Sequence, residues 1–162
     1  MNSLPRFVAL LLALVINLAA QPQIRPSYGP AITLEQAKKV LAAAETEARK
    51  NDWNVVVAIV DTGGNLVVLQ RMDDTQIASV TVAQQKAWSA AGYRRSTKTF
   101  EEAVAAGPAG ARTLALHGAM PVEGGLPIVV NGKIIGAIGV SGVTSQQDGQ
   151  IANAGLGALA QP

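Results

Sequence analysis

The chain has a single histidine, His117, and no cysteine, so a thiol nucleophile and a cysteine-ligated zinc site are excluded. Histidine is a frequent ligand of iron and of other transition metals. A lone histidine cannot build a site that needs two, and glycine follows it directly, as in a loop. His117 is therefore either a ligand or a residue of a ligand pocket, or an ordinary surface or structural histidine.

Arg71, Met72 and Asp73 follow one another at the end of a predicted strand. A planar guanidinium suits bidentate contact with a carboxylate, and a thioether is a soft ligand for iron. In the alternative interpretation, Arg71 and Asp73 form a structural ion pair at the sheet edge, and Met72 packs in the core. The sequence leaves both interpretations open.

Lys86 lies on a predicted helix that is otherwise lined by alanine. Its ammonium group either contacts an anion in a pocket or reaches solvent at the end of its methylene stem. The small residues of this helix permit close approach of another helix or of the sheet; they are Ala83, Ala87, Ala90 and Ala91.

The sequence shows no pattern typical of a catalytic site. Side chains that are adjacent in a strand or a helix point apart, so neither Asp73–Asp74 nor Glu101–Glu102 predicts an acid–base couple. No nucleophile-elbow pattern joins a serine to His117, and a triad is defined by geometry. We therefore expect a binding protein rather than an enzyme, with no catalytic residues.

The composition favours a compact domain with few charges. Hydrophobic residues make up 49% of the chain and charged residues 15%, which argues against disorder. Only 4% of the residues are aromatic, so aliphatic side chains must build the core. The net charge of +2 falls to about +1 without Arg6, and so small an excess indicates no nucleic-acid partner. Arg94 and Arg95 are expected at a solvated helix end.

Residues 1–20 have the order of a secretory signal peptide. Arg6 supplies the positive charge, an apolar stretch follows, and Ala19 and Ala20 end it with small residues. The apolar run is shorter than the roughly 20 residues that span a bilayer, which disfavours the alternative of a membrane anchor. We expect cleavage after Ala20, a periplasmic or secreted protein, and no stable membrane insertion after cleavage. Residues 21–30 predict a flexible linker before a single domain at 31–162.

The first half of the domain predicts a helix and then a β-hairpin. Thr33 and Gln36 can form a capping box at the start of an amphipathic helix that closes at Asn51. Apolar runs at 55–60 and 66–72 flank a glycine-containing turn. Because most positions of both runs are apolar, we expect both faces of this sheet to be covered.

Further helices are predicted between this hairpin and a second one. A long helix is expected at 77–93, and further helical turns at 111–116. Thr99 and Glu102 can form a second capping box, which predicts a short helix ending at Ala106.

The second β-hairpin is predicted near the C-terminus, before a last helix at 145–159. Strands at 126–130 and 133–140 flank Asn131-Gly132, a dipeptide typical of the type I′ turn. Two hairpins separated by helices predict an α+β domain, in which helices pack against a mainly antiparallel sheet.

Several motifs, taken together, resemble the GlcG/HbpS-like family. They are ITL at 32–34, AIVDTGGNL at 58–66, RMD at 71–73, KA at 86–87, GGLPI at 124–128, GAIGVSG at 136–142 and QD at 147–148. The same domain occurs at the C-terminal end of some corrinoid-metabolism proteins. The resemblance implies a profilin-like fold, homo-oligomerisation and a non-enzymatic role. Some relatives bind haem, and an exported one contributes to redox sensing.

The resemblance and the export segment predict an exported binding protein for haem or a related tetrapyrrole. The ligand site is expected near Arg71, Met72, Lys86 and His117, in a chain that acts as a homo-oligomer. Haem is the cofactor that the resemblance suggests, and its axial ligand and any other metal stay open. Two alternatives remain: an accessory module without haem that binds a sensor or pathway protein, and an enzyme acting on small hydroxy or keto acids, as glycolate-pathway relatives suggest.

Overall fold

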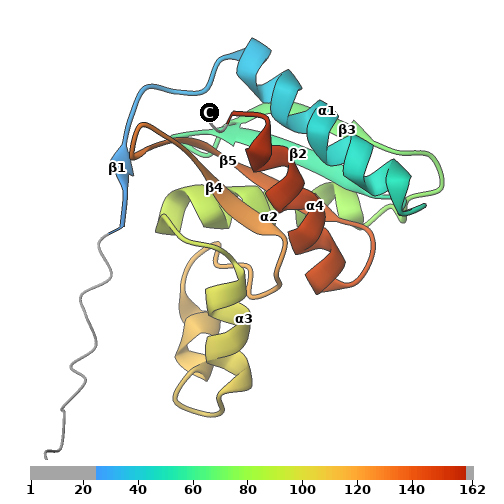
Figure 1. Ribbon diagram of the computed structural model, residues 1–162. Helices are drawn as coiled ribbons and strands as arrows, with labels where there is room; N and C mark the ends of the chain where they lie inside the picture. The colour runs from blue at the N-terminus through green and yellow to red at the C-terminus, as the bar shows by residue number, and fades with distance from the viewer. Residues whose placement is uncertain (1–24, 160–162) are drawn as a thin grey trace, which may run out of the picture.

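The computed structural model describes residues 25–159, and the predicted signal peptide lies outside them. The described backbone forms one five-stranded sheet with helices on both sides (Figure 1). The strands are β1 (Ser27–Tyr28), β2 (Val56–Asp61), β3 (Leu66–Arg71), β4 (Gly125–Val130) and β5 (Lys133–Ser141). The central strand β5 pairs antiparallel with β4 and β2, and β2 pairs antiparallel with β3. The prediction of an α+β domain with a mainly antiparallel sheet from two hairpins is confirmed.

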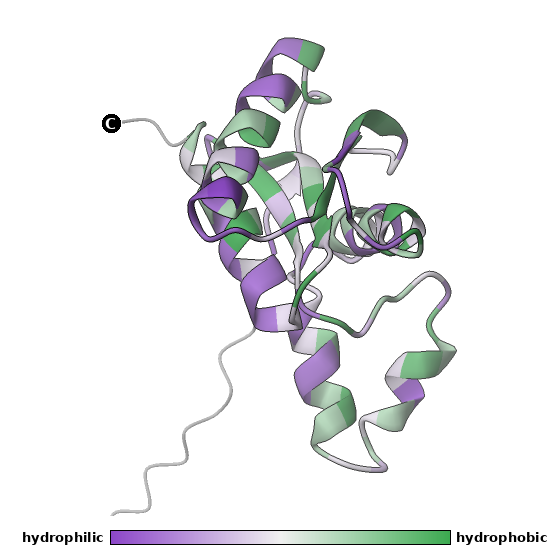
Figure 2. Cartoon of the chain, turned by 90° about the vertical axis from the view of Figure 1, so that its right-hand side faces the viewer, coloured by the Kyte–Doolittle hydropathy of each residue, from purple (hydrophilic) through white to green (hydrophobic). Residues whose placement is uncertain are grey.

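Helices cover both faces of the sheet. α1 (Leu34–Lys50) and α4 (Ser145–Gly157) pack together on one face, and α2 (Ser79–Tyr93) covers the other. α3 (Lys98–Ala105) and the 3-10 helix η1 (Ala111–Ala115) form a pair that stands off from the sheet (Figure 1). Figure 2 shows hydrophobic strand residues enclosed between the helical layers. The expected cover on both faces is thereby confirmed.

α2 approaches the sheet closely through its alanine face. Ala83 and Ala87 are fully buried beneath β5. A Cβ atom on Gly139 of β5 would lie 2.0 Å from the Ala83 carbonyl oxygen and 2.5 Å from the Ala87 amide nitrogen. Glycine on the strand and alanine on the helix therefore allow two backbones to meet with almost no side chain between them.

The two hairpin turns have the geometry that their residues favour. Asn131 and Gly132 both have positive φ, at 51° and 72°, as a type I′ turn requires. In the other turn, the Asp61 carboxylate accepts hydrogen bonds from the Gly63 and Asn65 amides at 2.8 and 2.9 Å. Both segments connect strands and act as scaffold turns.

The first predicted capping box is confirmed and the second is wrong. Thr33 and Gln36 make both reciprocal bonds at the start of α1. α3 begins at Lys98, and the Thr99 hydroxyl instead donates to the Ser96 carbonyl oxygen. The earlier start follows from Thr97, whose amide donates to the Gly125 carbonyl at 3.0 Å and fixes the entry of the helix on β4.

Part of the expected flexible linker forms a strand instead. Tyr28 pairs with Ile134 in parallel, and its hydroxyl donates to the Ala91 carbonyl oxygen at 2.8 Å. The segment that leads into α1 is thus fastened both to β5 and to the end of α2. Among residues 25–159, none of the helices has the length and apolar character needed to cross a membrane.

Candidate functional site

The Lys86 side chain lies in the interior and not in a pocket or in solvent. Its Nζ is 2.8 Å from Asp148 Oδ2 and donates to the Val140 carbonyl oxygen at 2.9 Å. Only 1% of the lysine side chain and 3% of the aspartate side chain are exposed. Burial raises the pKa of the Asp148 carboxyl, and the charge of Lys86 opposes that rise. Both sequence-based placements of Lys86 are wrong, because α4 supplies a carboxylate that the helix itself lacks.

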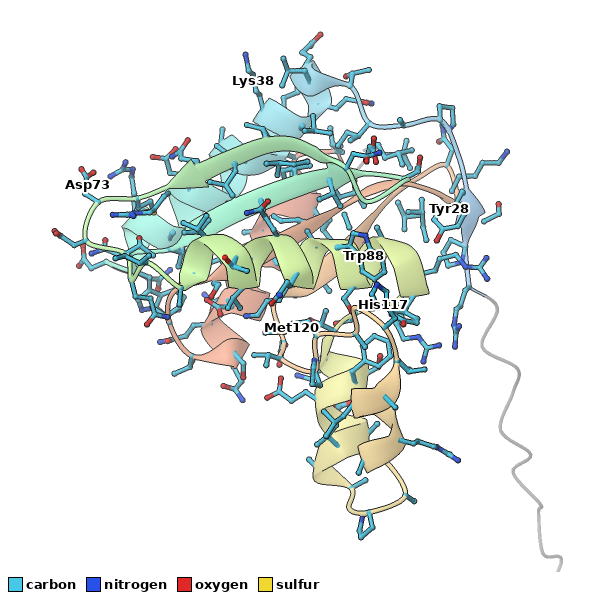
Figure 3. All side chains as sticks on the ribbon, turned by 180° about the vertical axis from the view of Figure 1, so that it is seen from behind. Tyr28, Lys38, Asp73, Trp88, His117 and Met120 are labelled. Carbon is cyan, nitrogen blue, oxygen red and sulfur yellow. The ribbon has the colours of Figure 1, made fainter. Side chains whose placement is uncertain are left out.

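Arg71 and Met72, which directly precede Asp73, do not lie beside His117. Arg71 is exposed at the end of β3, and no Arg71–Asp73 ion pair forms among the described residues. Met72 is buried, with its backbone amide bonded to the Val55 carbonyl. Figure 3 shows Asp73 at one end of α2 and Trp88 with His117 at the other. The four predicted residues therefore do not form a single pocket.

His117 is exposed on the loop that follows η1, beside α2 (Figure 3). Its ring stands edge-on to Trp88, with centroids 6.0 Å apart and planes at 90°. The Tyr93 hydroxyl donates to the His117 carbonyl oxygen at 2.6 Å and so fixes the backbone of this residue. The imidazole nitrogens take no part in the hydrogen bonds found within residues 25–159, so they are available to a ligand.

Trp88 connects His117 to a shallow surface pocket. This half-buried indole lines a pocket of about 250 Å³ together with Val60, Leu66 and Gln84. A Cβ atom on Gly118 would lie 2.3 Å from Trp88 Cζ3, so the loop bearing His117 packs directly on the indole. The tryptophan thus separates the pocket on one side from the histidine loop on the other.

Two arginines that the sequence placed at a solvated helix end are half-buried against aromatic rings. The Arg94 Cζ atom lies 5.7 Å from the Tyr28 ring centroid, and the Arg95 Cζ atom lies 5.1 Å from that of Phe100. Arg95 Nε also donates to the Tyr93 carbonyl oxygen at 3.4 Å. Sequence reasoning missed these residues, although the few aromatic residues of the chain gather near them and were an available signal.

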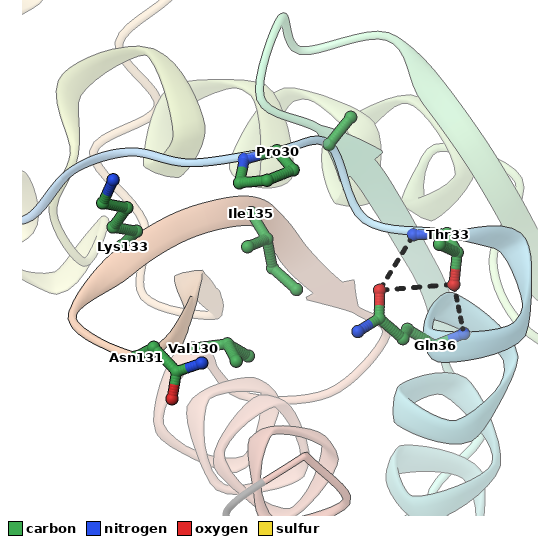
Figure 4. Close-up of a pocket in the computed structure, with 8 residues that line it drawn as sticks. Pro30, Thr33, Gln36, Val130, Asn131, Lys133 and Ile135 are labelled. Carbon is green, nitrogen blue, oxygen red and sulfur yellow. Dashed lines mark hydrogen bonds between the residues drawn. The ribbon is translucent and has the colours of Figure 1, made fainter.

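A second, larger pocket lies between the β4–β5 turn and the start of α1 (Figure 4). Its volume is about 330 Å³, and Pro30, Val130 and Ile135 form apolar walls with Lys133 beside them. The polar atoms of Thr33 and Gln36 bond one another there, as the dashed lines of Figure 4 show. None of the four predicted site residues lines this pocket.

The fold and the sequence define a known class of small α+β proteins. A family model described as "Haem degrading protein HbpS-like" matches residues 32–157, so the chain belongs to the HbpS-like family. Protein GlcG of Escherichia coli is 44% identical over 110 residues, which is 68% of this chain and 81% of that protein. The corrinoid adenosyltransferase PduO of Salmonella typhimurium is 30% identical over 144 residues, 87% of this chain but only 43% of that protein.

Solved structures show the same fold. The crystal structure of HbpS has a TM-score of 0.75 at 30% identity, covering 88% of this chain and 99% of that one. The crystal structure of a PduOC:haem complex has a TM-score of 0.71 at 28% identity, covering 79% and 94%. The predicted GlcG/HbpS-like family is thereby confirmed, and haem is a possible cofactor that is not established.

Proposed function

We propose that this chain is an exported protein that binds haem, with His117 as the ligand of the iron. The observation that carries the proposal is the exposed imidazole of His117, which has no hydrogen-bond partner among the described residues and stands beside Trp88. Neutral imidazole is a usual axial ligand of haem iron. The solved complex of the relative PduOC with haem supports the same ligand class.

The residues around His117 fit a flat, largely apolar ligand. The Trp88 ring supplies an apolar surface, and the bond from Tyr93 holds the loop, which limits the freedom lost on binding. When bound, haem supplies an iron centre for ligand binding or redox chemistry. Lys86 is excluded from direct contact because it is buried. Arg71 comes two residues before Asp73, which Figure 3 shows at the other end of α2.

Binding is proposed here rather than catalysis, although the names of some relatives point to enzymes. The family model carries the words "haem degrading", and PduO is named an adenosyltransferase. Incubation of the haem-loaded protein with a hydroperoxide separates the two roles. A binding protein does not bleach the Soret band faster than free haemin is bleached under the same conditions, whereas a degrading enzyme accelerates the bleaching and releases a linear tetrapyrrole.

Self-association and export are part of the proposal. Leu114 and Leu116, on and next to η1, are 62% and 43% exposed, and apolar side chains so displayed favour contact with another copy. Sedimentation of the wild type against Leu114→Ser tests the oligomer, and a monomeric wild type contradicts it. Mass spectrometry of the protein recovered from the periplasm or medium tests cleavage after Ala20, and an uncut chain contradicts it.

Titration with haemin tests the proposed iron ligand. The protein purified after expression of its full sequence is expected to sharpen and shift the Soret band, and His117→Ala is expected to weaken binding at least about tenfold. Arg71→Ala, an exposed change two residues from Asp73, is the matched control and is expected to leave binding unchanged. A His117→Ala protein with the wild-type spectrum and affinity contradicts the proposal.

A further inference from the structure

A cluster of positive charge lies at the C-terminal end of α2. We propose that Arg94 and Arg95 form a binding site for the carboxylate groups of a planar ligand. This inference rests on the proposed haem-binding function and adds how the acidic rim of the ligand is recognised. Haem carries two propionates, and a guanidinium offers paired donors that match a carboxylate.

The arginines of this cluster are held by aromatic rings rather than by carboxylates. Arg94 lies over Tyr28 and Arg95 over Phe100, at 5.7 and 5.1 Å from the ring centroids. The ion pairs within residues 25–159 involve other cations, namely Lys39, Arg49, Lys50, Lys86 and Lys98. Half-buried guanidinium groups without a carboxylate partner leave donors available to an anion.

Within residues 25–159, neither Arg94 nor Arg95 forms an ion pair with a carboxylate. Burial lowers the pKa of Arg95, and the nearby positive charge of Arg25 lowers it further. Like charges that face one another without a counter-charge raise the free energy of the folded chain. A bound carboxylate removes that repulsion, so the cluster favours an anionic ligand.

The backbone of Arg94 supports a role for its side chain. Arg94 closes α2 in the left-handed conformation, with φ 54° and ψ 43°. Glycine is the usual residue at such a helix end because a Cβ atom is unfavourable there. Strain of this kind persists where the side chain contributes something else. Here that contribution is a guanidinium group placed at the end of the helix.

Tyr93 joins the arginine cluster to His117. Its carbonyl oxygen accepts from Arg95 Nε, and its hydroxyl donates to the His117 carbonyl oxygen. The arginines and the histidine therefore share one end of α2, where Figure 3 also shows Tyr28. A flat ligand bound here would have His117 and Trp88 beside its apolar face and the two arginines beside the carboxylates at its edge.

Metal-free protoporphyrin IX and its dimethyl ester test the carboxylate site without iron. Wild-type protein is expected to bind the diacid at least about tenfold more tightly than the ester, measured by porphyrin fluorescence. Arg94→Gly with Arg95→Gln is expected to abolish this preference, and Arg71→Gln is expected to keep it. Equal affinity for diacid and ester, or no binding of the diacid at 100-fold molar excess over the protein, overturns the inference.

Two further measurements keep this result separate from folding and from the iron ligand. Arg94→Gly alone is expected to raise the urea midpoint while it weakens diacid binding, and a purely structural arginine does not give this combination. His117→Ala is expected to lose haemin affinity but to keep the diacid preference. If His117→Ala leaves haemin binding unchanged while the arginine variants lose the preference, the iron ligand is wrong and the carboxylate site stands.

Discussion

Lys86 and Asp148 form an ion pair that joins helices on opposite faces of the sheet. The Nζ–Oδ2 distance is 2.8 Å, and the second carboxylate oxygen accepts from the Val143 amide at 3.3 Å. The pair passes Gly124, where a Cβ atom would lie 2.9 Å from Lys86 Nζ. The described residues contain no buried side-chain polar atom without a partner, so the pair is a fully satisfied link between α2 and α4.

Removal of one partner of this pair is expected to be strongly destabilising. Lys86→Met leaves Asp148 as a buried, unpaired carboxylate, and we expect a loss of about 3–5 kcal/mol in the free energy of unfolding. The double variant Lys86→Met/Asp148→Leu is expected to recover most of it, because no buried charge remains. Urea denaturation measures all three proteins. A double variant that is less stable than Lys86→Met contradicts the prediction.

Because the backbones of α2 and β5 are in close contact, one added methyl group between them is expected to lower the stability of the fold. Gly139→Ala places a Cβ atom 2.0 Å from the Ala83 carbonyl oxygen, which the backbone must move to relieve. We expect a loss of about 1–3 kcal/mol, read from urea midpoints. Gly157→Ala is the matched control, since nothing lies within 4 Å of its Cβ position. Equal stabilities of the two variants contradict this packing.

Asp61 predicts a pH dependence of the first hairpin. Burial raises its pKa, but hydrogen bonds from Asn65 and Gly63 more than offset this, so the folded pKa lies below 3.8. A lowered folded pKa contributes stability above the unfolded value and loses it as the pH falls through the folded value. The stability difference between wild type and Asp61→Asn is therefore expected to be constant above about pH 5 and to shrink in acid. A stability difference between the two proteins that grows as the pH falls contradicts the lowered folded pKa of Asp61.

The loop that bears His117 depends on Gly118. Gly118→Ala puts a Cβ atom 2.3 Å from Trp88 Cζ3 at a positive φ of 68°, so the loop must shift away from the indole. We expect a changed Trp88 fluorescence and haemin binding at least about tenfold weaker. Gly107→Ala also introduces a Cβ atom at a positive φ, 113°, but with nothing within 4 Å, and it is expected to leave both readings unchanged. A Gly118→Ala protein that matches this control contradicts the contact.

The turns and the start of the first helix could be predicted from the sequence because interactions between neighbouring residues determine them. Asn131-Gly132 favours one turn type, and Thr33 with Gln36 satisfies the first amides of α1 wherever the helix lies. The capping box predicted for Thr99 does not form, because a hydrogen bond from the Thr97 amide to the Gly125 carbonyl fixes the start of α3. A pattern of four residues carries no information about such a distant partner.

The candidate site depended on distances that the sequence does not contain. Lys86 and Asp148 are 62 positions apart, and their contact becomes visible only when α2 and α4 are placed on the sheet. Arg71 and His117 both bear suitable chemistry, but Asp73, two residues after Arg71, and His117 lie at opposite ends of α2 in Figure 3. Arg94 looked like a solvated charge because the ring of Tyr28 reaches it only through the pairing of β1 with β5.

The helical pair α3–η1 stands off from the sheet (Figure 1), and we expect it to open before the rest of the domain. Its base is held by Thr97, Lys98 and Glu101, which bond to Gly125, Glu123 and Ser145. Its far end rests mainly on its own backbone bonds. Amide hydrogens at that far end are expected to exchange with solvent while those of β2 and β5 stay protected. We therefore expect contacts made by the exposed Leu114 and Leu116 to be lost on heating before the sheet unfolds.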